Sequence, residues 1–319
     1  MLRKILLICS LCLFINILQA KSLDNFLAEY DYQKLKLVNT NQEFATPYLI
    51  GKVNQNKAYV LFDSGSKGVS IFNFSVNQLK LNKIEDQNYS LNMAGQKSKN
   101  YNVILDKIEI GNISLNNIKA RITTQPKKKQ YPIIIVGLDF LEKYNAILDF
   151  SRSYIYLTNR TITPKEHYLI GQKLQNNSDY LLINLTKLIS QYQIMSIAID
   201  NNSPVNCLVD TGTSNFTIAN KYSESLGLKS TSKKTIQATD GTLTIADANI
   251  SSLIINPLNI FFQKKVELDN VSATSANIEP MSKFLGVLCV LGYKELSRMN
   301  SIYDIAAATI YIRNNHKLL

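Results

Sequence analysis

Two short stretches of the sequence place a carboxylate at the end of an apolar run, and they are nearly the same. Residues 60–66 read VLFDSGS and residues 207–213 read CLVDTGT. A lone carboxylate at the end of a buried strand is costly, because burial removes the water that stabilises its charge. Its repetition indicates that the two acids act together. The residues concerned are Asp63, Ser64, Gly65 and Ser66 in the first stretch and Asp210, Thr211, Gly212 and Thr213 in the second.

Two carboxylates held close together cannot both ionise cheaply, so such a pair shares one proton. The ionised member can take a proton from a water molecule while the protonated member gives one to a carbonyl oxygen. This division of labour suits the hydrolysis of an amide bond, with neither a metal nor a cofactor. Asp63 and Asp210 are therefore the expected catalytic pair, if the fold brings them together.

The residues after each aspartate suit a tight loop around a charged group. The glycine of each stretch has no Cβ, so the backbone can turn sharply and bring its N–H toward the carboxylates. The hydroxyls of Ser64 and Thr211 are expected to form hydrogen bonds across the interface between the two loops. Ser66 and Thr213 are expected to donate to the aspartates, which favours their charged form and predicts a mildly acidic pH optimum.

The repetition extends well beyond the two motifs. Residues 136–157 resemble residues 291–312 at a constant offset of 155 positions, which aligns Gly137 with Gly292. An internal duplication of this kind predicts two similar lobes that pack about a pseudo-two-fold axis. Near that axis the two motif aspartates would face each other.

Short segments rich in β-branched and aromatic residues predict an all-β fold. The polar segment 161–178, which contains Pro164, is the natural boundary. We therefore expect an N-terminal lobe at residues 21–160, a linker at 161–178 and a C-terminal lobe at 179–319. Short helices are expected at residues 23–29, 139–144, 220–227 and 294–299.

The two motifs resemble the active-site motifs of aspartic proteases of the retropepsin-like and pepsin-like kind. Residues 133–150, IIIVGLDFLEKYNAILDF, resemble the second half of a retropepsin-like domain, in which a strand ending in glycine completes the crossing of the active-site loop. The resemblance covers about residues 40–160 and 180–315. It implies two β-barrel lobes in one chain, related by a pseudo-two-fold axis, as in exported bacterial proteins with tandem aspartyl-protease lobes.

The resemblance also implies a function. Asp63 and Asp210 would be the catalytic dyad of an endopeptidase, the substrate would be a polypeptide, and the chain would be a monomer that forms the pair internally. Two alternatives remain: a non-catalytic peptide-binding or scaffold protein that has kept the fold, and a dimer of tandem domains. Two glycine turns are candidate flaps over the substrate, and their residues are Ala94, Gly95, Asp240 and Gly241.

The first motif departs from the family pattern at Lys67, where a small or apolar residue is commoner. Its charge either lies near the dyad and lowers the pKa values of the pair or points to solvent. Asp139 has no acidic counterpart in the second half, where Lys294 stands, so we interpret it as a residue that supports a helix start. Four apolar residues near the motifs are expected to line substrate pockets or the core: Val69, Ile71, Phe216 and Ile218.

The N-terminus has the layout of a secretory signal. Residues 1–4 are a short basic head, and residues 5–18 are apolar except for Ser10 and Asn16. An apolar core of about 14 residues is short for a membrane span, so residues 1–20 predict a signal peptide and an exported, periplasmic or secreted protein. If the segment is not removed, it would tether the protein to the membrane.

The chain is basic, with a formal net charge of +11 over 319 residues. Its lysines are scattered, and the one dense run, at residues 127–129, has no aromatic residues interleaved, so a nucleic-acid partner is not expected. Two cysteines follow the signal, Cys207 and Cys289. Buried free thiols are the simpler interpretation, and a disulfide is the alternative if their strands are neighbours. No spacing typical of metal ligands occurs.

Overall fold

The computed structural model describes most of the chain after the predicted signal. The described residues are 22–38, 46–91, 97–124, 129–176, 180–228, 233–238, 241–255 and 266–313. The predicted signal peptide at 1–20 and three flap candidates, Ala94, Gly95 and Asp240, lie outside these ranges. No helix among the described residues is long and apolar enough to cross a membrane.

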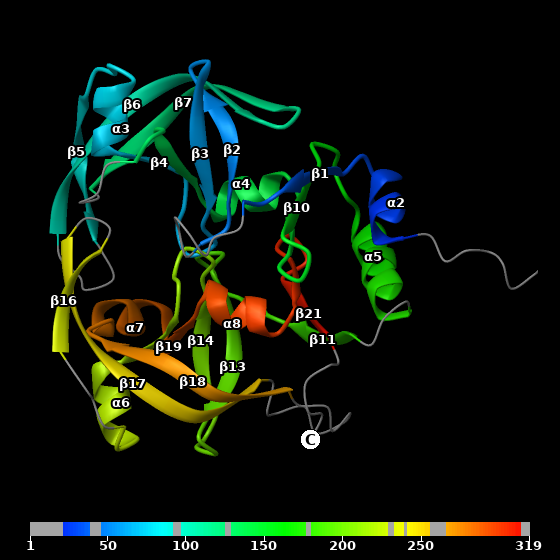
Figure 1. Cartoon of the computed structure of the whole chain (residues 1–319), viewed down its shortest axis with the longest axis vertical. Helices are drawn as coiled ribbons and strands as arrows, with labels where there is room; N and C mark the ends of the chain where they lie inside the picture. The colour runs from blue at the N-terminus through cyan, green and yellow to red at the C-terminus, as the bar shows by residue number, and fades with distance from the viewer. Residues whose placement is uncertain are drawn as a thin grey trace, which may run out of the picture.

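The N-terminal lobe is a closed barrel of six strands (Figure 1). The barrel closes because β2 pairs with β3 on one side and with β6 on the other. An additional strand, β5 (Ile84–Leu91), pairs with the outer part of β6 as an antiparallel hairpin arm. In barrel order the strands are β2 (Tyr48–Val53), β3 (Asn56–Phe62), β8 (Ile133–Val136), β4 (Val69–Phe72), β7 (Ile113–Thr123) and β6 (Lys97–Ile110).

The C-terminal lobe repeats this barrel strand for strand. It closes through the pairing of β13 with β17, and β16 (Lys233–Ala238) extends β17 as β5 extends β6. A two-residue strand, β12 (Thr186–Lys187), adds to the edge of β13. The barrel strands are β13 (Gln193–Ile199), β14 (Val205–Val209), β19 (Cys289–Leu291), β15 (Phe216–Ala219), β18 (Val266–Ala276) and β17 (Gly241–Ile255).

A third sheet of six strands joins the lobes, and each lobe contributes part of it. Its centre is the antiparallel pair β9 and β20, in which Tyr303 lies opposite Leu148. These two residues are related by the offset of 155, so the register places the pseudo-two-fold axis between them. The strands, in order, are β1 (Gln33–Lys36), β10 (Tyr154–Leu157), β9 (Ile147–Asp149), β20 (Ile302–Asp304), β21 (Thr309–Arg313) and β11 (Tyr180–Asn184).

Two helices cover the outer face of this central sheet: α2 (Leu23–Ala28) and α5 (Pro164–Asn176) (Figure 1). Leu27 of α2 and Ile170 of α5 are buried in one cluster with residues of the sheet, among them Tyr311. This burial explains why much of the segment expected to be a linker is helical. The sequence of 161–178 is mostly polar, but its few apolar residues pack against the central sheet. This packing is enough to stabilise the helix.

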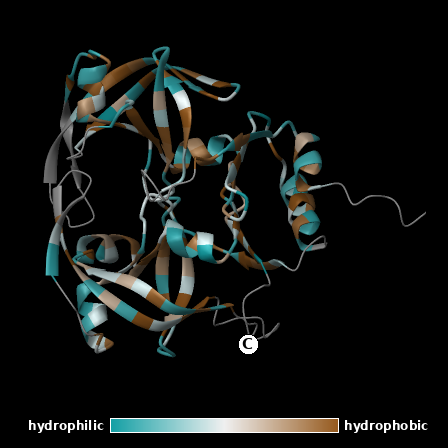
Figure 2. Cartoon of the chain, in the orientation of Figure 1, coloured by the Kyte–Doolittle hydropathy of each residue, from teal (hydrophilic) through white to brown (hydrophobic). Residues whose placement is uncertain are grey.

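The four expected helices are confirmed within two residues at each end, as α2, α4 (Leu138–Lys143), α6 (Asn220–Ser225) and α8 (Tyr293–Arg298). Three further helices were not expected from the sequence: α3 (Asn73–Gln78), α7 (Glu279–Leu285) and α5. Hydrophobic and hydrophilic residues are mixed along the long strands β7 and β18 (Figure 2), which are buried on one face, whereas the short central strands β8 and β19 are buried along their whole length. The main core includes Phe62, Leu148, Phe216 and Tyr303.

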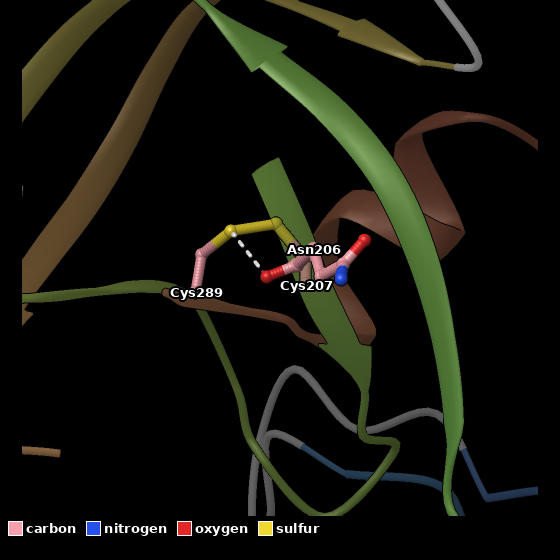
Figure 3. The surroundings of a disulfide bond; sticks show 3 residues. All are labelled: Asn206, Cys207 and Cys289. Atoms are coloured by element: carbon pink, nitrogen blue, oxygen red, sulfur yellow. Dashed lines mark hydrogen bonds between the residues drawn. A yellow bond between two sulfur atoms is a disulfide. The ribbon is translucent and has the colours of Figure 1, made fainter. Parts of the chain in front are cut away.

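The expectation of buried free thiols is wrong. Cys207 on β14 and Cys289 on β19 are direct partners on neighbouring parallel strands, with Cα atoms 4.4 Å apart, and they form a disulfide (Figure 3). Both side chains are fully buried. The Cys289 sulfur also lies 3.7 Å from the backbone oxygen of Asn206. The disulfide therefore ties together the two strands that lead into the second motif and its Gly292 crossing.

Candidate active site

The two motif aspartates occupy equivalent positions, one at the end of each barrel's central parallel strand pair. Asp63 follows β3, and its backbone N–H donates to the Val136 carbonyl at 3.1 Å. Asp210 follows β14 and donates in the same way to Leu291 at 3.0 Å. In both lobes a loop then crosses back and returns as an antiparallel partner of β8 or β19. The carboxylates are thus fixed by the sheets and not by loose loops.

The motif glycines show that the two carboxylates meet. A Cβ built on Gly65 would lie 2.5 Å from both carboxylate oxygens of Asp210. A Cβ built on Gly212 would lie within 2.6 Å of both carboxylate oxygens of Asp63. Each glycine therefore faces the aspartate of the other lobe, and no other residue type fits at this distance. The structure brings together the aspartates that the sequence places 147 positions apart.

A reciprocal set of buried hydrogen bonds joins the two loops. The Thr211 hydroxyl accepts from the backbone N–H of Ser64 at 3.0 Å and donates to the Phe62 carbonyl at 2.8 Å. The Ser64 hydroxyl accepts from the backbone N–H of Thr211 and donates to the Val209 carbonyl, both at 3.0 Å. The expected bonding across the interface is confirmed. Each hydroxyl bridges two backbone groups of the opposite lobe.

Hydrogen bonds to the carboxylates themselves are not symmetric. The backbone N–H of Gly65 donates to Asp63 at 2.9 Å, and that of Gly212 donates to Asp210 at 2.8 Å. Thr213 adds a hydroxyl bond of 2.7 Å to the second oxygen of Asp210.

Ser66 also acts as a hydrogen-bond partner of the Asp63 side chain and lowers its pKa, as expected. Its hydroxyl is shared, however, because it also lies 3.4 Å from the Asp63 backbone carbonyl.

Burial is the main cause of a pKa for Asp63 well above its usual range, and the charge of Asp210 adds to it. A hydrogen bond to Asp210 acts in the same direction, whereas the Gly65 N–H lowers the pKa. Asp63 is nonetheless partly exposed to solvent, whereas Asp210 is buried, with 7% of its surface exposed. Asp63 therefore keeps its proton to a higher pH than an ordinary carboxyl group, while part of its surface stays exposed.

Glycines at the ends of β8 and β19 allow the crossing of the motif loops. A Cβ on Gly137 would lie 2.7 Å from the Ser66 carbonyl, and one on Gly292 would lie 2.7 Å from the Thr213 carbonyl. The following residues hydrogen-bond to the same loops, as Leu138 does to Ser66 at 2.8 Å. The crossing that the resemblance implied is present in both lobes.

Asp139 supports the first motif loop, and Tyr303 joins the central sheet to the C-terminal barrel. Asp139 accepts a 2.7 Å bond from the backbone N–H of Gly68, so its role is to hold the first motif loop as well as to open α4. The buried Tyr303 hydroxyl donates to Gln193 at 2.8 Å. Gln193 in turn donates to the Ile305 carbonyl at 2.8 Å, which links the central sheet to the C-terminal barrel.

Lys67 is exposed, and its side chain reaches toward the other lobe. Its ammonium lies 5.6 Å from the ring centroid of Tyr192, a residue of the other lobe that directly precedes β13. Burial raises the pKa of Tyr192, and the charges of Asp63 and Asp210 raise it further. Sequence reasoning missed Tyr192. It lies outside both motifs, and only the barrel closure brings it near them.

Three of the four apolar residues expected near the motifs belong to the core, since Ile71, Phe216 and Ile218 are fully buried. Val69 is partly exposed. Gly241, the flap candidate that lies within the described ranges, opens β17 opposite Ala238. The described residues contain no cluster of three or more acidic, histidine or cysteine side chains that could hold a metal ion.

Comparison with known proteins agrees with this geometry. Residues 49–143 match the model of a family described as gag-polyprotein putative aspartyl protease. Residues 195–288 match the model of a family described as aspartyl protease. The chain belongs to the aspartyl protease family. Each match falls on one barrel, so this aspartyl protease-family chain consists of two retropepsin-like lobes that arose by internal duplication.

Among solved structures, the chain is similar to a retropepsin-like aspartic protease from Rickettsia conorii, with 18% identity and a TM-score of 0.31. The similarity covers 41% of this chain and 98% of that chain. No curated protein matches the sequence significantly.

One buried acid near the site has no part in the dyad. Glu295 on α8 is fully buried and has no side-chain hydrogen-bond partner among the described residues, and the backbone N–H groups of Glu295 and Phe216 lower its pKa only in part. Burial raises its pKa from 4.5 to about 7. At the equivalent position of the first lobe the sequence has Phe140, which is also buried. The C-terminal lobe thus carries an ionisable group where its twin carries an apolar one.

The hydroxyl bridges can be tested by stability. Thr211→Val preserves the side-chain shape but leaves the Ser64 N–H and the Phe62 carbonyl without their partner. Because unpaired buried groups are expensive, we expect a loss of about 2 kcal/mol in the free energy of unfolding, measured by urea denaturation. Thr211→Ser, which copies the first lobe, is the matched control and should lose less than half as much. Equal stability of the two variants would contradict the bridging role.

Glu295 should make stability depend on pH. Its folded pKa lies above its unfolded value, so the native state is most stable below pH 4.5 and is destabilised as pH rises through about 7. The shift corresponds to about 3 kcal/mol. We expect Glu295→Gln to gain that amount relative to wild type between pH 4 and pH 8. The exposed Glu224→Gln is the control and should track wild type, and a pH-independent difference for Glu295→Gln would refute the assignment.

Proposed function

We propose that the protein is an aspartic endopeptidase that hydrolyses peptide bonds with a water molecule activated between Asp63 and Asp210. The observation that carries this proposal is the convergence of two carboxylates from pseudo-symmetric loops, each faced by the glycine of the other lobe. The raised pKa of Asp63, caused by burial and by Asp210, supports a shared proton at the pH where the chemistry occurs.

The asymmetry of the hydrogen bonds suggests how the roles divide. Asp210, which accepts from both Gly212 and Thr213, would be the ionised member that takes a proton from the water. Asp63 would be the protonated member that gives its proton to the carbonyl oxygen of the substrate. The new carbon–oxygen bond then gives a neutral tetrahedral diol. Its collapse breaks the C–N bond as a proton is transferred to the leaving amine.

An extended polypeptide is the substrate that this arrangement suits. Its backbone can hydrogen-bond like an added strand beneath the β5–β6 and β16–β17 hairpins. Both hairpins extend from the same side of the molecule, on the left in Figure 1.

Export and a monomeric state complete the proposal. The disulfide between Cys207 and Cys289 supports an oxidising compartment, periplasmic or extracellular, with a membrane tether if the signal is retained. Recovery of the protein from the cytoplasm with free thiols would argue against export. Because one chain supplies both aspartates, an active monomer is expected in sedimentation, and activity confined to a dimer would contradict this.

The dyad is tested by peptide hydrolysis across pH 3 to 8 with Asp63→Asn and Asp210→Asn. Each substitution removes either the acid or the base, so we expect kcat to fall by about 10³-fold or more in both variants, as measured with a quenched fluorescent peptide library. Asp269→Asn, an exposed position on β18, is the control and should retain full activity. Wild type that binds peptides without cleaving them would favour the non-catalytic peptide-binding alternative.

The division of roles predicts an asymmetric pH profile. Thr213→Val removes the hydroxyl that supports ionised Asp210, so the acid limb of kcat/KM should move to higher pH by about half a unit or more. Thr213→Ser retains a hydroxyl and should keep the wild-type limb. Ser66→Ala should shift the profile less, because its hydroxyl is shared between the Asp63 side chain and the Asp63 backbone carbonyl. A larger shift for Ser66→Ala than for Thr213→Val would reverse the assignment.

A further inference from the structure

The positive charge of Lys67 is not among the main causes of the Asp63 pKa shift. Lys67 is exposed, it directly follows the motif hydroxyl Ser66, and its ammonium lies over the ring of Tyr192. Within the part of the chain that the structure describes, no carboxylate lies within ion-pair distance of it. The shift of the Asp63 pKa is explained by burial, by Asp210 and by hydrogen bonds from its own loop. The ammonium is therefore available to a ligand.

Tyr192 supplies a second polar group from the opposite lobe. It is partly exposed, and no hydrogen bond of its hydroxyl to another described residue is present. Its raised pKa, set first by burial and then by the charges of Asp63, Asp210 and Asp139, keeps the phenol protonated and hence a hydrogen-bond donor. The same charges show that the ring is close to the dyad.

Charges of both signs act on Tyr192: Asp63, Asp210 and Asp139 raise its pKa, and Arg121 lowers it. Asp139, which also acts on Tyr192, is occupied by the 2.7 Å bond from the Gly68 N–H. Arg121 on β7 lowers the Tyr192 pKa and so adds positive potential. Nearby, Lys187 and Glu142 neutralise each other across the lobes at 2.9 Å.

We propose that Lys67 and Tyr192 form a subsite, one residue from each lobe, that selects an acidic side chain next to the scissile bond. A carboxylate there accepts one hydrogen bond from the ammonium and a second from the phenol. This inference rests on the proposed function, because it assigns a substrate preference to the same dyad. A substrate with aspartate or glutamate at the position that contacts Lys67 and Tyr192, on one side or the other of the scissile bond, is thus cleaved with a higher kcat/KM than the same substrate with asparagine or glutamine there.

A purely structural pairing of Lys67 with Tyr192 makes a different prediction. If the cation–π contact only braces the lobes, its loss lowers stability and affects all peptides equally. If the pair recognises a carboxylate, its loss affects acidic peptides alone. The comparison of Glu and Gln peptides separates these two roles.

The test uses matched peptides that differ only by Glu or Gln at each position around one cleaved bond. For wild type we expect kcat/KM to favour Glu by about fivefold at one position, and the ratio to decline at high salt because exposed charges are screened. Lys67→Met and Tyr192→Phe should each lower the ratio of kcat/KM for the Glu peptide to that for the Gln peptide toward one. Lys67→Arg should preserve the ratio, and Lys67→Glu should bring it below one.

The outcomes distinguish this inference from the proposed function. Cleavage with no Glu preference at any position, or a preference that survives Lys67→Met, overturns the subsite and leaves the protease intact. Equal losses for Glu and Gln peptides assign the pair a bracing role and also overturn it. A parallel calorimetric titration uses statine-containing Glu and Gln peptides, which place a hydroxyl where the attacking water lies. Absence of both cleavage and statine binding overturns the proposed function together with the inference.

Discussion

Two carboxylates that share one water-poor site impose the constraint on which this molecule depends. Each acid would be costly alone, and together they are tolerable only if one proton is shared and the remaining charge is hydrogen-bonded. That condition fixes the backbone around them. Gly65 and Gly212 are needed because each lies against the opposing carboxylate. Ser64 and Thr211 then hold the two loops in register through four buried bonds.

The pseudo-symmetry that creates the pair is kept in the backbone and relaxed in the side chains. The central register of β9 with β20 is self-complementary, and both barrels close through equivalent strands. Side chains around the dyad differ in ways that chemistry can use. The Thr213 hydroxyl donates to its carboxylate at 2.7 Å, whereas the Ser66 hydroxyl is shared with a backbone carbonyl 3.4 Å away, and Glu295 stands where the first lobe has Phe140. Such differences give two equivalent acids two different environments, which is what separate acid and base roles require.

Much of the fold and the pairing of the two aspartates could be predicted from the sequence, because the duplication repeats each motif in the second half of the chain. The motifs and the offset of 155 positions fix which residues are equivalent, and equivalence predicts that Asp63 meets Asp210. Helix α5 was not predictable, because its few apolar residues acquire meaning only against the central sheet. The bonding of Cys207 to Cys289 depends on strand adjacency, and the place of Tyr192 depends on barrel closure. These are long-range consequences that no local pattern carries.

The shared central sheet has a further consequence, for how the active site is assembled. Because β9 and β20 belong to one covalent chain, the two halves meet at an effective concentration of the order of millimolar, whatever the concentration of the protein. Pairing of the two aspartates is thus first-order in protein. A site built from two separate chains dissociates when it is diluted, whereas this chain carries both halves. A very dilute solution of the protein therefore keeps complete pairs of aspartates.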